Sequence, residues 1–262
     1  MKVHPDSLDR YTESHRLPND YIEYYQANGF VKVPGIVPRV DALRIGERCR
    51  AISDEARRTG TAQGGGMQVF TQVVNTWRAD EAVREAVFHP NITAVAKQLA
   101  GGALRLWHDH ILVKEPRNEA ATEWHQDQPY WPHANSTRPI SCWLALVDVP
   151  ADRGSMSFIP GVQHRDDIPR QTLTDKRSLF SLAPDLEYLP KVTLPLKAGD
   201  CTFHHGRTPH MANANATDDP RVALAIIYID TVTTYTGADH VVTDGLDLNE
   251  GELIAGDLFP EV

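Results

Sequence analysis

The early part of the chain carries apolar residues spaced as on one face of a helix. Across 40–58 the apolar positions recur at steps of three and four residues, which predicts an amphipathic helix. Two shorter helices are predicted over 19–28, where Gly29 is placed to end the helix, and over 90–99. We therefore expect a helical front that spans about 18–101.

The pattern changes after the helical front to short apolar or alternating runs that are separated by turn residues. These runs predict strands over 104–113, 140–149, 155–159, 192–196, 201–204 and 221–229, with one earlier strand over 30–33. Many short strands without helices between them indicate a sandwich or barrel rather than a parallel α/β sheet. With no repeat, low-complexity block or linker, we expect one mainly β domain over 1–262, with its β body at about 104–232. Two irregular stretches, 60–67 and 165–190, are expected to act as lids or binding loops.

Composition and charge exclude several classes of protein. The 262 residues hold 26 Lys and Arg against 35 Asp and Glu, a formal net charge of −9, which does not favour a nucleic-acid-binding surface. The longest apolar run, 222–229, is far shorter than the roughly 20 residues that cross a bilayer, and the first ten residues are too polar for a signal peptide. Only three cysteines occur, without a CxxC pair, which argues against a disulfide scaffold. We expect a cytoplasmic globular protein with no membrane or nucleic-acid partner.

The most informative segment is EWHQDQPYW, residues 123–131. On a strand, residues two apart project from the same face, so His125 and Asp127 could hold one metal ion together. With a second histidine from elsewhere they would form the two-histidine, one-carboxylate set of non-haem Fe(II) oxygenases, which leaves coordination sites open for a co-substrate and O₂. The doublet alone is weak, because His-x-Asp also occurs at His4 and at His164.

The missing ligand is sought in the segment 198–221. Four side chains there could supply it or support the site: His204, His205, Arg207 and His210. Because adjacent residues face opposite ways on a strand, only one of His204 and His205 is expected to lie near the site, while the other packs outside.

Arg221 opens the predicted strand 221–229 and shares a face with Ala223 and Ala225. A guanidinium followed by small residues suits a cavity that holds a small carboxylate, because the planar fork of arginine matches two carboxylate oxygens. The alternative is an arginine at the surface that pairs with Asp218 or Asp219.

Several motifs in order give the chain a resemblance to a known family. They are LVKEP, WHQDQPYW, SCWLALVDV, GSMSFIPGVQH, AGDCTFHHGRTPH and HMANANATDDPR. Together with the eleven-residue interval from His210 to Arg221, they resemble the phytanoyl-CoA dioxygenase family of Fe(II)/2-oxoglutarate oxygenases over about 20–229. The resemblance implies a double-stranded β-helix core, of jelly-roll or cupin-like type, with the N-terminal helices packed outside it.

The resemblance also implies roles for individual residues. It implies that His125, Asp127 and His210 are the Fe(II) ligands. It also implies that Arg221 binds the distal carboxylate of 2-oxoglutarate. Further co-substrate contacts are implied at Trp143, Gln126, Lys114 and His110, although Lys114 could equally be solvated and His110 could be a substrate contact or a core residue. The chain departs from the family at Ala212, where a serine is frequent. The ligand Asp127 is intact, which favours hydroxylation over halogenation.

The function implied is oxidation, with hydroxylation favoured, of a C–H bond in a small metabolite or natural-product intermediate. The reaction would need Fe(II), 2-oxoglutarate and O₂, and it would release succinate and CO₂. Candidates for substrate contacts at the mouth of the barrel are Trp107, His108, Tyr130, Trp131 and Phe158. The acidic net charge favours a neutral or cationic metabolite over a coenzyme A ester. Two alternatives stay open: a cupin-like metalloenzyme that does not use 2-oxoglutarate, and a non-catalytic member that only binds ligands.

Overall fold

The computed structural model of the chain describes residues 16–64, 69–171 and 178–262. Its helices are α2 (Asn19–Asn28), α3 (Arg39–Thr59), α4 (Glu81–Val87), α5 (Pro90–Ala100) and α6 (Leu179–Leu182), with 3-10 turns η2 (Thr76–Arg78), η3 (Gln128–Tyr130) and η4 (Pro184–Tyr188). The three helices predicted for the front of the chain lie within one residue of their expected bounds. None of the helices in the described ranges is both long and apolar enough to cross a bilayer.

The strands form two main antiparallel sheets and a small third one. They are β1 (Phe30–Val33), β2 (Gln63–Gly64), β3 (Thr71–Val74), β4 (Leu104–Lys114), β5 (Thr122–His125), β6 (His133–Ala134), β7 (Ile140–Ala145), β8 (Met156–Phe158), β9 (Val192–Leu194), β10 (Cys201–His205), β11 (His210–Ala212), β12 (Arg221–Asp230) and β13 (Thr234–Tyr235). The large sheet has the order β1-β10-β7-β12-β4-β3-β2, the second β5-β11-β8-β9 and the third β13-β6. A mainly β fold with helices outside it is confirmed.

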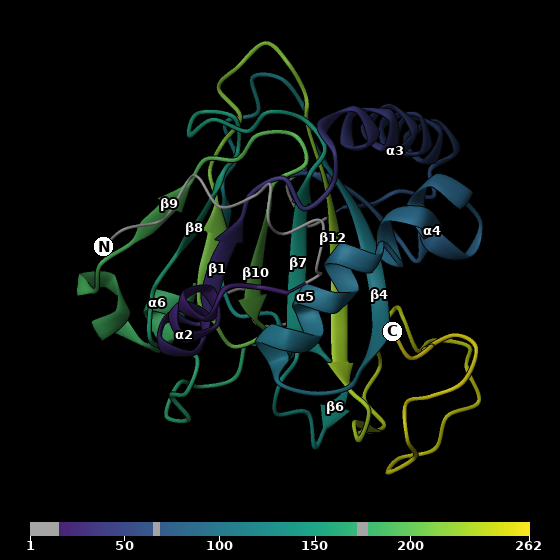
Figure 1. Cartoon of the computed structure of the whole chain (residues 1–262), viewed down its shortest axis with the longest axis vertical. Helices are drawn as coiled ribbons and strands as arrows, with labels where there is room; N and C mark the ends of the chain where they lie inside the picture. The colour runs from purple at the N-terminus through teal and green to yellow at the C-terminus, as the bar shows by residue number, and fades with distance from the viewer. Residues whose placement is uncertain (1–15, 65–68, 172–177) are drawn as a thin grey trace.

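Strand β12 shows how the chain builds two hydrophobic layers from one strand. Its even-numbered residues from Val222 to Tyr228 pack in an outer cluster with α3 and α5, while Ala223, Ala225 and Ile227 belong to an inner cluster with β8, β9 and β11 of the second sheet. The period-two prediction for this strand therefore holds. In Figure 1, α5 crosses in front of the large sheet, which leaves the opposite face of that sheet for the second sheet.

A β-bulge in β4 changes which side chains reach the space between the sheets. Ile227 of β12 pairs with His108 and Tyr228 pairs with Leu106, so Trp107 has no partner in the ladder. Such a bulge re-aims side chains. Adjacent residues of a regular strand face opposite sides. Because of the bulge, Trp107 and His108 both face the space between the sheets: Trp107 packs in the inner cluster, and His108 lines the cavity.

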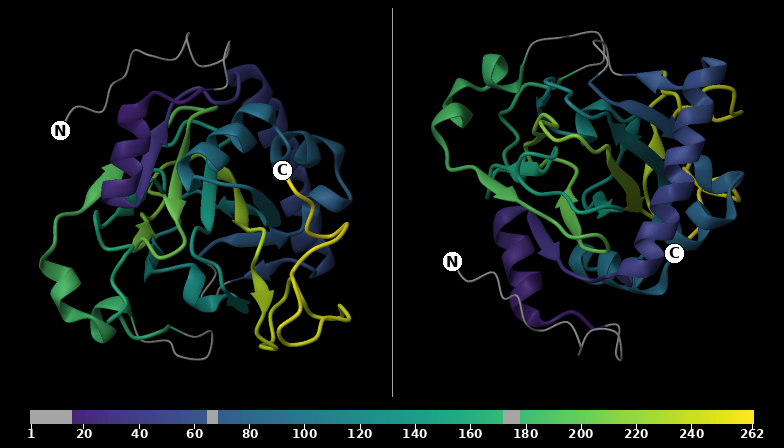
Figure 2. Two further views of the ribbon diagram at one scale, coloured as in Figure 1. Left: turned by 60° about the horizontal axis from the view of Figure 1, so that its bottom comes forward. Right: turned by 90° about the horizontal axis from the view of Figure 1, so that it is seen from above.

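The segment that follows β12 returns to the barrel and packs on it. It is the yellow segment beside the lower end of β12 in Figure 1 and along one edge in Figure 2. Its Val242, Ile254 and Phe259 join the inner cluster, and Leu106 donates a backbone hydrogen bond to Pro260 O at 2.9 Å. The packed structure therefore continues well beyond the end of the β body expected at about 232.

The two irregular stretches are only partly described. The first, 60–67, contains β2, and its residues 65–67 lie outside the described ranges. The second, 165–190, contains α6 and η4, and its residues 172–177 lie outside those ranges. Their expected role as lids stays a prediction.

Candidate metal centre and co-substrate pocket

The two candidate histidine ligands face each other across neighbouring strands. His125 ends β5 and His210 begins β11, and the two residues are paired in the antiparallel ladder. The Nδ1 of His125 lies 2.7 Å from Glu123 O, and the Nδ1 of His210 lies 2.9 Å from Thr208 O. Because a carbonyl accepts a hydrogen bond, each Nδ1 carries the proton and each Nε2 is left with a lone pair for a metal ion.

The carboxylate reaches the same point from a bend rather than from the strand. Strand β5 ends at His125, and Asp127 has the helical backbone conformation (φ −73°, ψ −50°) that begins η3. The prediction that both residues project from one strand face was therefore wrong. The side chains still converge: Asp127 Oδ1 lies 3.5 Å from the Nε2 of His125 and 3.5 Å from the Nε2 of His210.

This donor set suits a ferrous ion. One ligand atom from each of His125, Asp127 and His210 lies within 4.8 Å of the other two. Two imidazole nitrogens and a carboxylate oxygen on one side are the ligands of non-haem Fe(II) sites. Burial raises the pKa of Asp127, but the adjacent His210, His125 and His204 outweigh burial and hold it well below its usual range. Burial lowers the pKa of His210 to about 3, so this imidazole is neutral and able to bind a cation.

Two further side chains hold the second oxygen of Asp127. His204 Nε2 and Ser141 Oγ each lie 3.2 Å from Asp127 Oδ2, from strands β10 and β7. His205, the next residue of β10, turns the other way and places its Nε2 3.2 Å from Thr137 O. The expected division between the two adjacent histidines is what the geometry shows.

A glycine near the start of the chain supports His210 from behind. Gly29 ends α2 with φ +81°, a conformation that favours glycine, and a side chain there would collide with Thr208 and Gln163. This close approach allows Thr208 Oγ1 to donate a hydrogen bond to Gly29 O at 2.7 Å. Because Thr208 O also holds the ring of His210, the glycine indirectly helps fix that ligand.

Arg221 is buried at the other end of the cavity, and no described residue is its acidic partner. Its side chain is only 2% exposed, its Nη1 donates to Leu112 O at 3.1 Å, and its Nε has no hydrogen-bond partner in the described chain. The guanidinium carbon lies 5.2 Å from the centre of the Trp143 ring. Burial lowers the pKa of Arg221 to about 10, so it is still charged at neutral pH. Buried cations are usually paired with an anion, so this guanidinium is suited to bind one.

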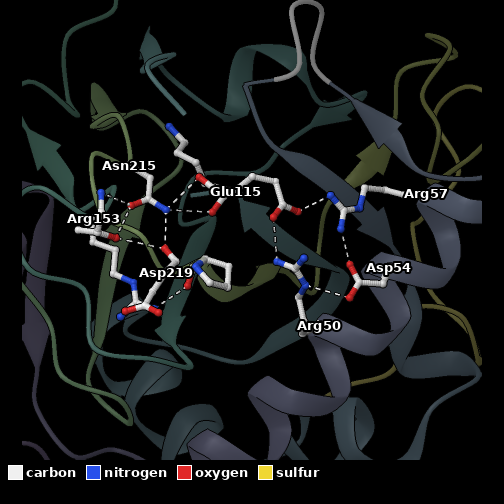
Figure 3. Close-up of polar contacts among 10 residues, drawn as sticks. Arg50, Asp54, Arg57, Glu115, Arg153, Asn215 and Asp219 are labelled. Carbon is white, nitrogen blue, oxygen red and sulfur yellow. Dashed lines mark hydrogen bonds and ion pairs between the residues drawn. The ribbon is translucent and has the colours of Figure 1, made fainter. Parts of the chain in front are cut away.

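Among the described contacts, neither Asp218 nor Asp219 forms an ion pair with the buried Arg221. Asp218 Oδ1 lies 2.7 Å from Arg117 Nε, and the backbone O of Asp219 accepts a hydrogen bond from Asn215 Nδ2 at 2.8 Å. The interpretation of Arg221 as a surface arginine paired with either aspartate was therefore wrong. Figure 3 shows Asn215 bridging this turn to the end of β4, where its Nδ2 also donates to Glu115 O at 3.0 Å.

The same end of the barrel is tied to helix α3 by an ion-pair cluster. Glu115 accepts from Arg50 Nη1 at 3.0 Å and contacts Arg57, and both arginines also pair with Asp54 (Figure 3). Partly exposed pairs of this kind contribute little each to stability. They connect α3 to the residue that follows β4.

Lys114 is buried rather than solvated. Its Nζ donates to Ala120 O at 2.9 Å and to Asn213 O at 2.8 Å. Burial, followed by the charge of Arg221, lowers its pKa to about 7. Lys114 therefore positions the loops behind Arg221 and adds to the positive potential there, but it does not line the cavity.

One cavity of about 380 Å³ connects the candidate metal ligands with Arg221. Of the other predicted site residues, five line it: Trp143, His110, His108, Tyr130 and Trp131. This volume falls within the usual range for small-molecule sites.

Three other predicted site residues lie outside the cavity lining. Gln126 is buried behind the bend, and its Nε2 donates to Arg207 O at 2.6 Å. Trp107 stacks on Phe259 with ring centres 5.3 Å apart, because the bulge places it behind His108. Phe158 stacks on Phe30 at 4.5 Å and supports the ligand histidines from the core. Direct contacts of these three with co-substrate or substrate are not supported.

Several residues that line the cavity were not predicted from the sequence. The most notable is His240, which reaches the cavity from the segment after β12, together with Val241. Phe70, Gln72, Met156 and Met211 also line it. The sequence carries no local signal for these positions, because they meet only through pairing between distant strands.

The chain is similar to proteins of known activity. The sequence profile described as phytanoyl-CoA dioxygenase matches residues 25–223. The L-proline trans-4-hydroxylase of Streptomyces griseoviridis is 27% identical over 143 residues, which are 53% of this chain and 53% of that protein, so the chain spans about half the length of that relative. The peroxisomal phytanoyl-CoA dioxygenase of Homo sapiens is 20% identical over 85% of this chain and 71% of the relative.

Solved structures extend the similarity over nearly the whole chain. The non-haem alpha-ketoglutarate-dependent carbocyclase SnoK from nogalamycin biosynthesis is 33% identical with a TM-score of 0.83, over 94% of this chain and 97% of that one. The epimerase SnoN, in complex with Fe3+, alpha-ketoglutarate and nogalamycin RO, is 32% identical with a TM-score of 0.80, over 93% and 97%. Both are oxygenase-type enzymes that use the co-substrate for which Arg221 is the candidate anchor.

Proposed function

The chain belongs to the phytanoyl-CoA dioxygenase family, and from this premise we propose that its cavity oxidises a C–H bond of a small metabolite with Fe(II), 2-oxoglutarate and O₂. The observation that carries the proposal is one cavity that holds a His-Asp-His donor set and, facing it, a buried arginine without an acidic partner in the described chain. The family is defined by this co-substrate, which bears a carboxylate at each end.

In this proposal, each half of the site has one task. His125, Asp127 and His210 would hold the ferrous ion, while His204 and Ser141 fix the carboxylate of Asp127. The chemistry supplied by the bound ion is activation of O₂, coupled to oxidative decarboxylation of 2-oxoglutarate to succinate and CO₂.

Arg221 binds the distal carboxylate of 2-oxoglutarate through its free guanidinium nitrogens. Trp143 closes that end of the pocket by stacking on the guanidinium, which excludes water and strengthens the ion pair. Ala223 and Ala225, on the same face of β12, leave room for the body of the co-substrate. We place this chemistry in a cytoplasmic, single-domain protein with a small-molecule partner, which is consistent with its three unpaired cysteines.

The proposal is tested by replacing Arg221. The Arg221→Leu variant should raise the KM for 2-oxoglutarate by about 10- to 100-fold, since one or two charge-assisted hydrogen bonds are lost. Arg221→Lys should recover part of the affinity, and the matched surface variant Arg117→Leu should change nothing. Steady-state succinate release and iron content measure both effects. An unchanged KM in Arg221→Leu would favour a metalloenzyme that does not use 2-oxoglutarate.

A second candidate reaction is ring closure or epimerisation in place of hydroxylation. The observation in its favour is that SnoK and SnoN match 94% and 93% of this chain at 33% and 32% identity, whereas the hydroxylase matches 53% at 27%. Mass spectrometry of the product separates the three outcomes. Hydroxylation adds one oxygen atom, ring closure removes two hydrogen atoms, and epimerisation leaves the mass unchanged.

A further inference from the structure

Three imidazole rings, those of His108, His110 and His240, line the part of the cavity that is distant from Arg221. We call them the histidine row. His110 and His108 of β4 lie beside Ala225 and Ile227 of β12, which places them roughly 13 and 20 Å along the strand from Arg221. The ring of His108 stacks on that of His110 with centres 4.1 Å apart and lies 6.2 Å from that of His240.

His108 is buried, and it has no hydrogen-bond partner among the described residues. Its side chain is 1% exposed, it lines the cavity, and neither ring nitrogen is bonded to any described residue. A buried polar group without a partner is unfavourable, so it is expected to be satisfied by a ligand or water. The proposed function, which uses Arg221 and the metal ligands, makes no use of this ring.

The tautomer of His240 is set by its own backbone. Its Nδ1 accepts the N–H of Val242 at 3.2 Å, so in the neutral ring Nε2 carries the proton and is a donor. His108, with both nitrogens free, offers one donor and one acceptor. The two rings together can therefore both donate to and accept from one ligand group, which is what a hydroxyl requires.

The row is not a second metal site. Within the described residues, His125, Asp127 and His210 are the group whose ligand atoms approach closely enough to hold an ion, and the row is not among them. It also contains no carboxylate or thiolate that would offset the charge of an ion.

The described residues that line the rest of the cavity carry no charge that could select a charged substrate. Among the described lining residues, the charged side chains are Asp127 and Arg221, and the proposed function uses both. Apolar side chains of the cavity wall lie next to these histidines: Ile227 pairs with His108, and Val241 follows His240 in the chain. A polyanionic thioester or a zwitterionic amino acid would find no complementary group there.

We propose that His108 and His240 bind a hydroxyl group of an uncharged, largely apolar substrate and so select it and orient it toward the metal centre. This inference rests on the proposed function, because it assumes that Arg221 is occupied by 2-oxoglutarate. His108 is thus a specificity-determining residue. The substrate class is a neutral alcohol or phenol with an apolar body, in contrast to the thioester and amino-acid substrates in the names of the curated relatives.

Three matched probes test the proposal: 2-naphthol, 2-methoxynaphthalene and 2-naphthoate. They share one ring system and differ in carrying a hydroxyl, a methoxy or a carboxylate group. Binding is measured by calorimetry to the full chain loaded with Fe(II) and 2-oxoglutarate under anaerobic conditions, and 2-oxoglutarate binding is measured separately. We expect 2-naphthol to bind about tenfold more tightly than either other probe, the effect of one hydrogen bond that only the hydroxyl makes fully.

Variants assign that preference to the row. His108→Leu should remove it by weakening 2-naphthol about tenfold, whereas His108→Gln, which keeps a donor and an acceptor, should retain part of it. His164→Leu, at an exposed histidine outside the cavity, is the control. If circular dichroism shows that His108→Leu does not fold, His240→Phe tests the same preference.

The outcomes separate this inference from the proposed function. Tight 2-oxoglutarate binding without any preference for 2-naphthol, or with a preference that survives both His108→Leu and His240→Phe, would overturn the inference alone. Failure of the wild-type protein to bind 2-oxoglutarate would overturn both. Tighter binding of 2-naphthoate than of 2-naphthol would instead indicate an anionic substrate and would also overturn the inference.

Discussion

Two groups of histidines face the same cavity, and they differ in what lies between their rings. His125 and His210 have Asp127 at their centre and a backbone carbonyl behind each ring. His108 and His110 stack directly on each other, and neither ring nitrogen of His108 is bonded to a carboxylate or a carbonyl of the described residues. The same residue type therefore has a different electrostatic environment on each side of one cavity.

The difference shows how one carboxylate decides the role of a histidine cluster. In the first group burial lowers the pKa of His210 to about 3, whereas Asp127, which accepts a hydrogen bond from the protonated His125 ring and attracts its charge, outweighs burial and raises the pKa of His125. In the second group burial, followed by the neighbouring imidazoles, lowers the pKa of His108 well below its usual value. The first group is thus an anionic site that attracts a cation, and the second is a neutral wall that offers hydrogen bonds.

Removing the carboxylate of Asp127 should make the two histidine groups electrostatically alike. We expect it to give the largest loss of activity. In Asp127→Asn, succinate formation should fall by at least about a thousandfold, because the charge that binds the ion is lost while the side-chain shape is kept. His125→Ala should behave alike, with little change in the far-ultraviolet circular dichroism of either variant. Asp218→Asn, at an exposed aspartate, is the control. Turnover retained in His125→Ala would contradict the ligand assignment.

Replacing His204, which contacts the carboxylate of Asp127, should have an intermediate effect on Fe(II) binding. His204→Ala frees one side of Asp127 Oδ2 and should weaken Fe(II) binding by about 10- to 100-fold, as expected for a partner of a metal ligand. His205→Ala changes the adjacent residue on the same strand, which turns away from the site. Competition with a metal indicator measures both affinities. Equal losses in the two variants would indicate general loosening of β10 rather than a specific contact.

The neutral wall should make the fold sensitive to acid. Burial lowers the pKa of His110 to about 4, with His240 adding to the shift and Asp127 opposing it, and burial lowers the pKa of His240 to about 4. Because the unfolded chain protonates these rings near pH 6.5, their contribution to stability is complete above that pH and is lost as the pH falls toward 4. The pKa of His108, whose ring stacks on that of His110, is also lowered by burial.

Replacing one ring of the wall should flatten this pH dependence. In His110→Phe, the slope of the unfolding free energy against pH between about 4 and 6.5 should fall by up to about 1.4 kcal/mol per pH unit, the value for one proton. Urea titrations at several pH values measure it. A slope that matches wild type would mean that the His110 ring is protonated equally in both states.

The smallest effect is expected behind the metal site. Gln126→Leu removes the hydrogen bond to Arg207 O and should lower the unfolding free energy by about 1 kcal/mol. The KM for 2-oxoglutarate should stay within about twofold of wild type, since Gln126 does not line the cavity. A rise comparable to that in Arg221→Leu would restore Gln126 as a co-substrate contact.

The sequence by itself determined the fold class and the chemistry to be sought. Helical spacing located α2, α3 and α5, because an amphipathic helix must repeat its apolar residues at a local period. Period two located both faces of β12, with Arg221 on the inner one. The motifs around His125, Asp127 and His210 supplied the candidate ligands, since a metal needs particular side chains whatever fold presents them.

Only the tertiary structure decided which candidates meet. Pairing between strands far apart in sequence places His210 opposite His125 and brings His240 to the cavity from the last part of the chain. A β-bulge in β4 leaves Trp107 out of the ladder in which His108 is paired. A bend at the start of η3, rather than a strand, directs Asp127 toward the two histidine ligands. Local periodicity cannot encode such features, because a bulge or a non-local contact is selected by the packing energy of the whole barrel rather than by the residues on either side.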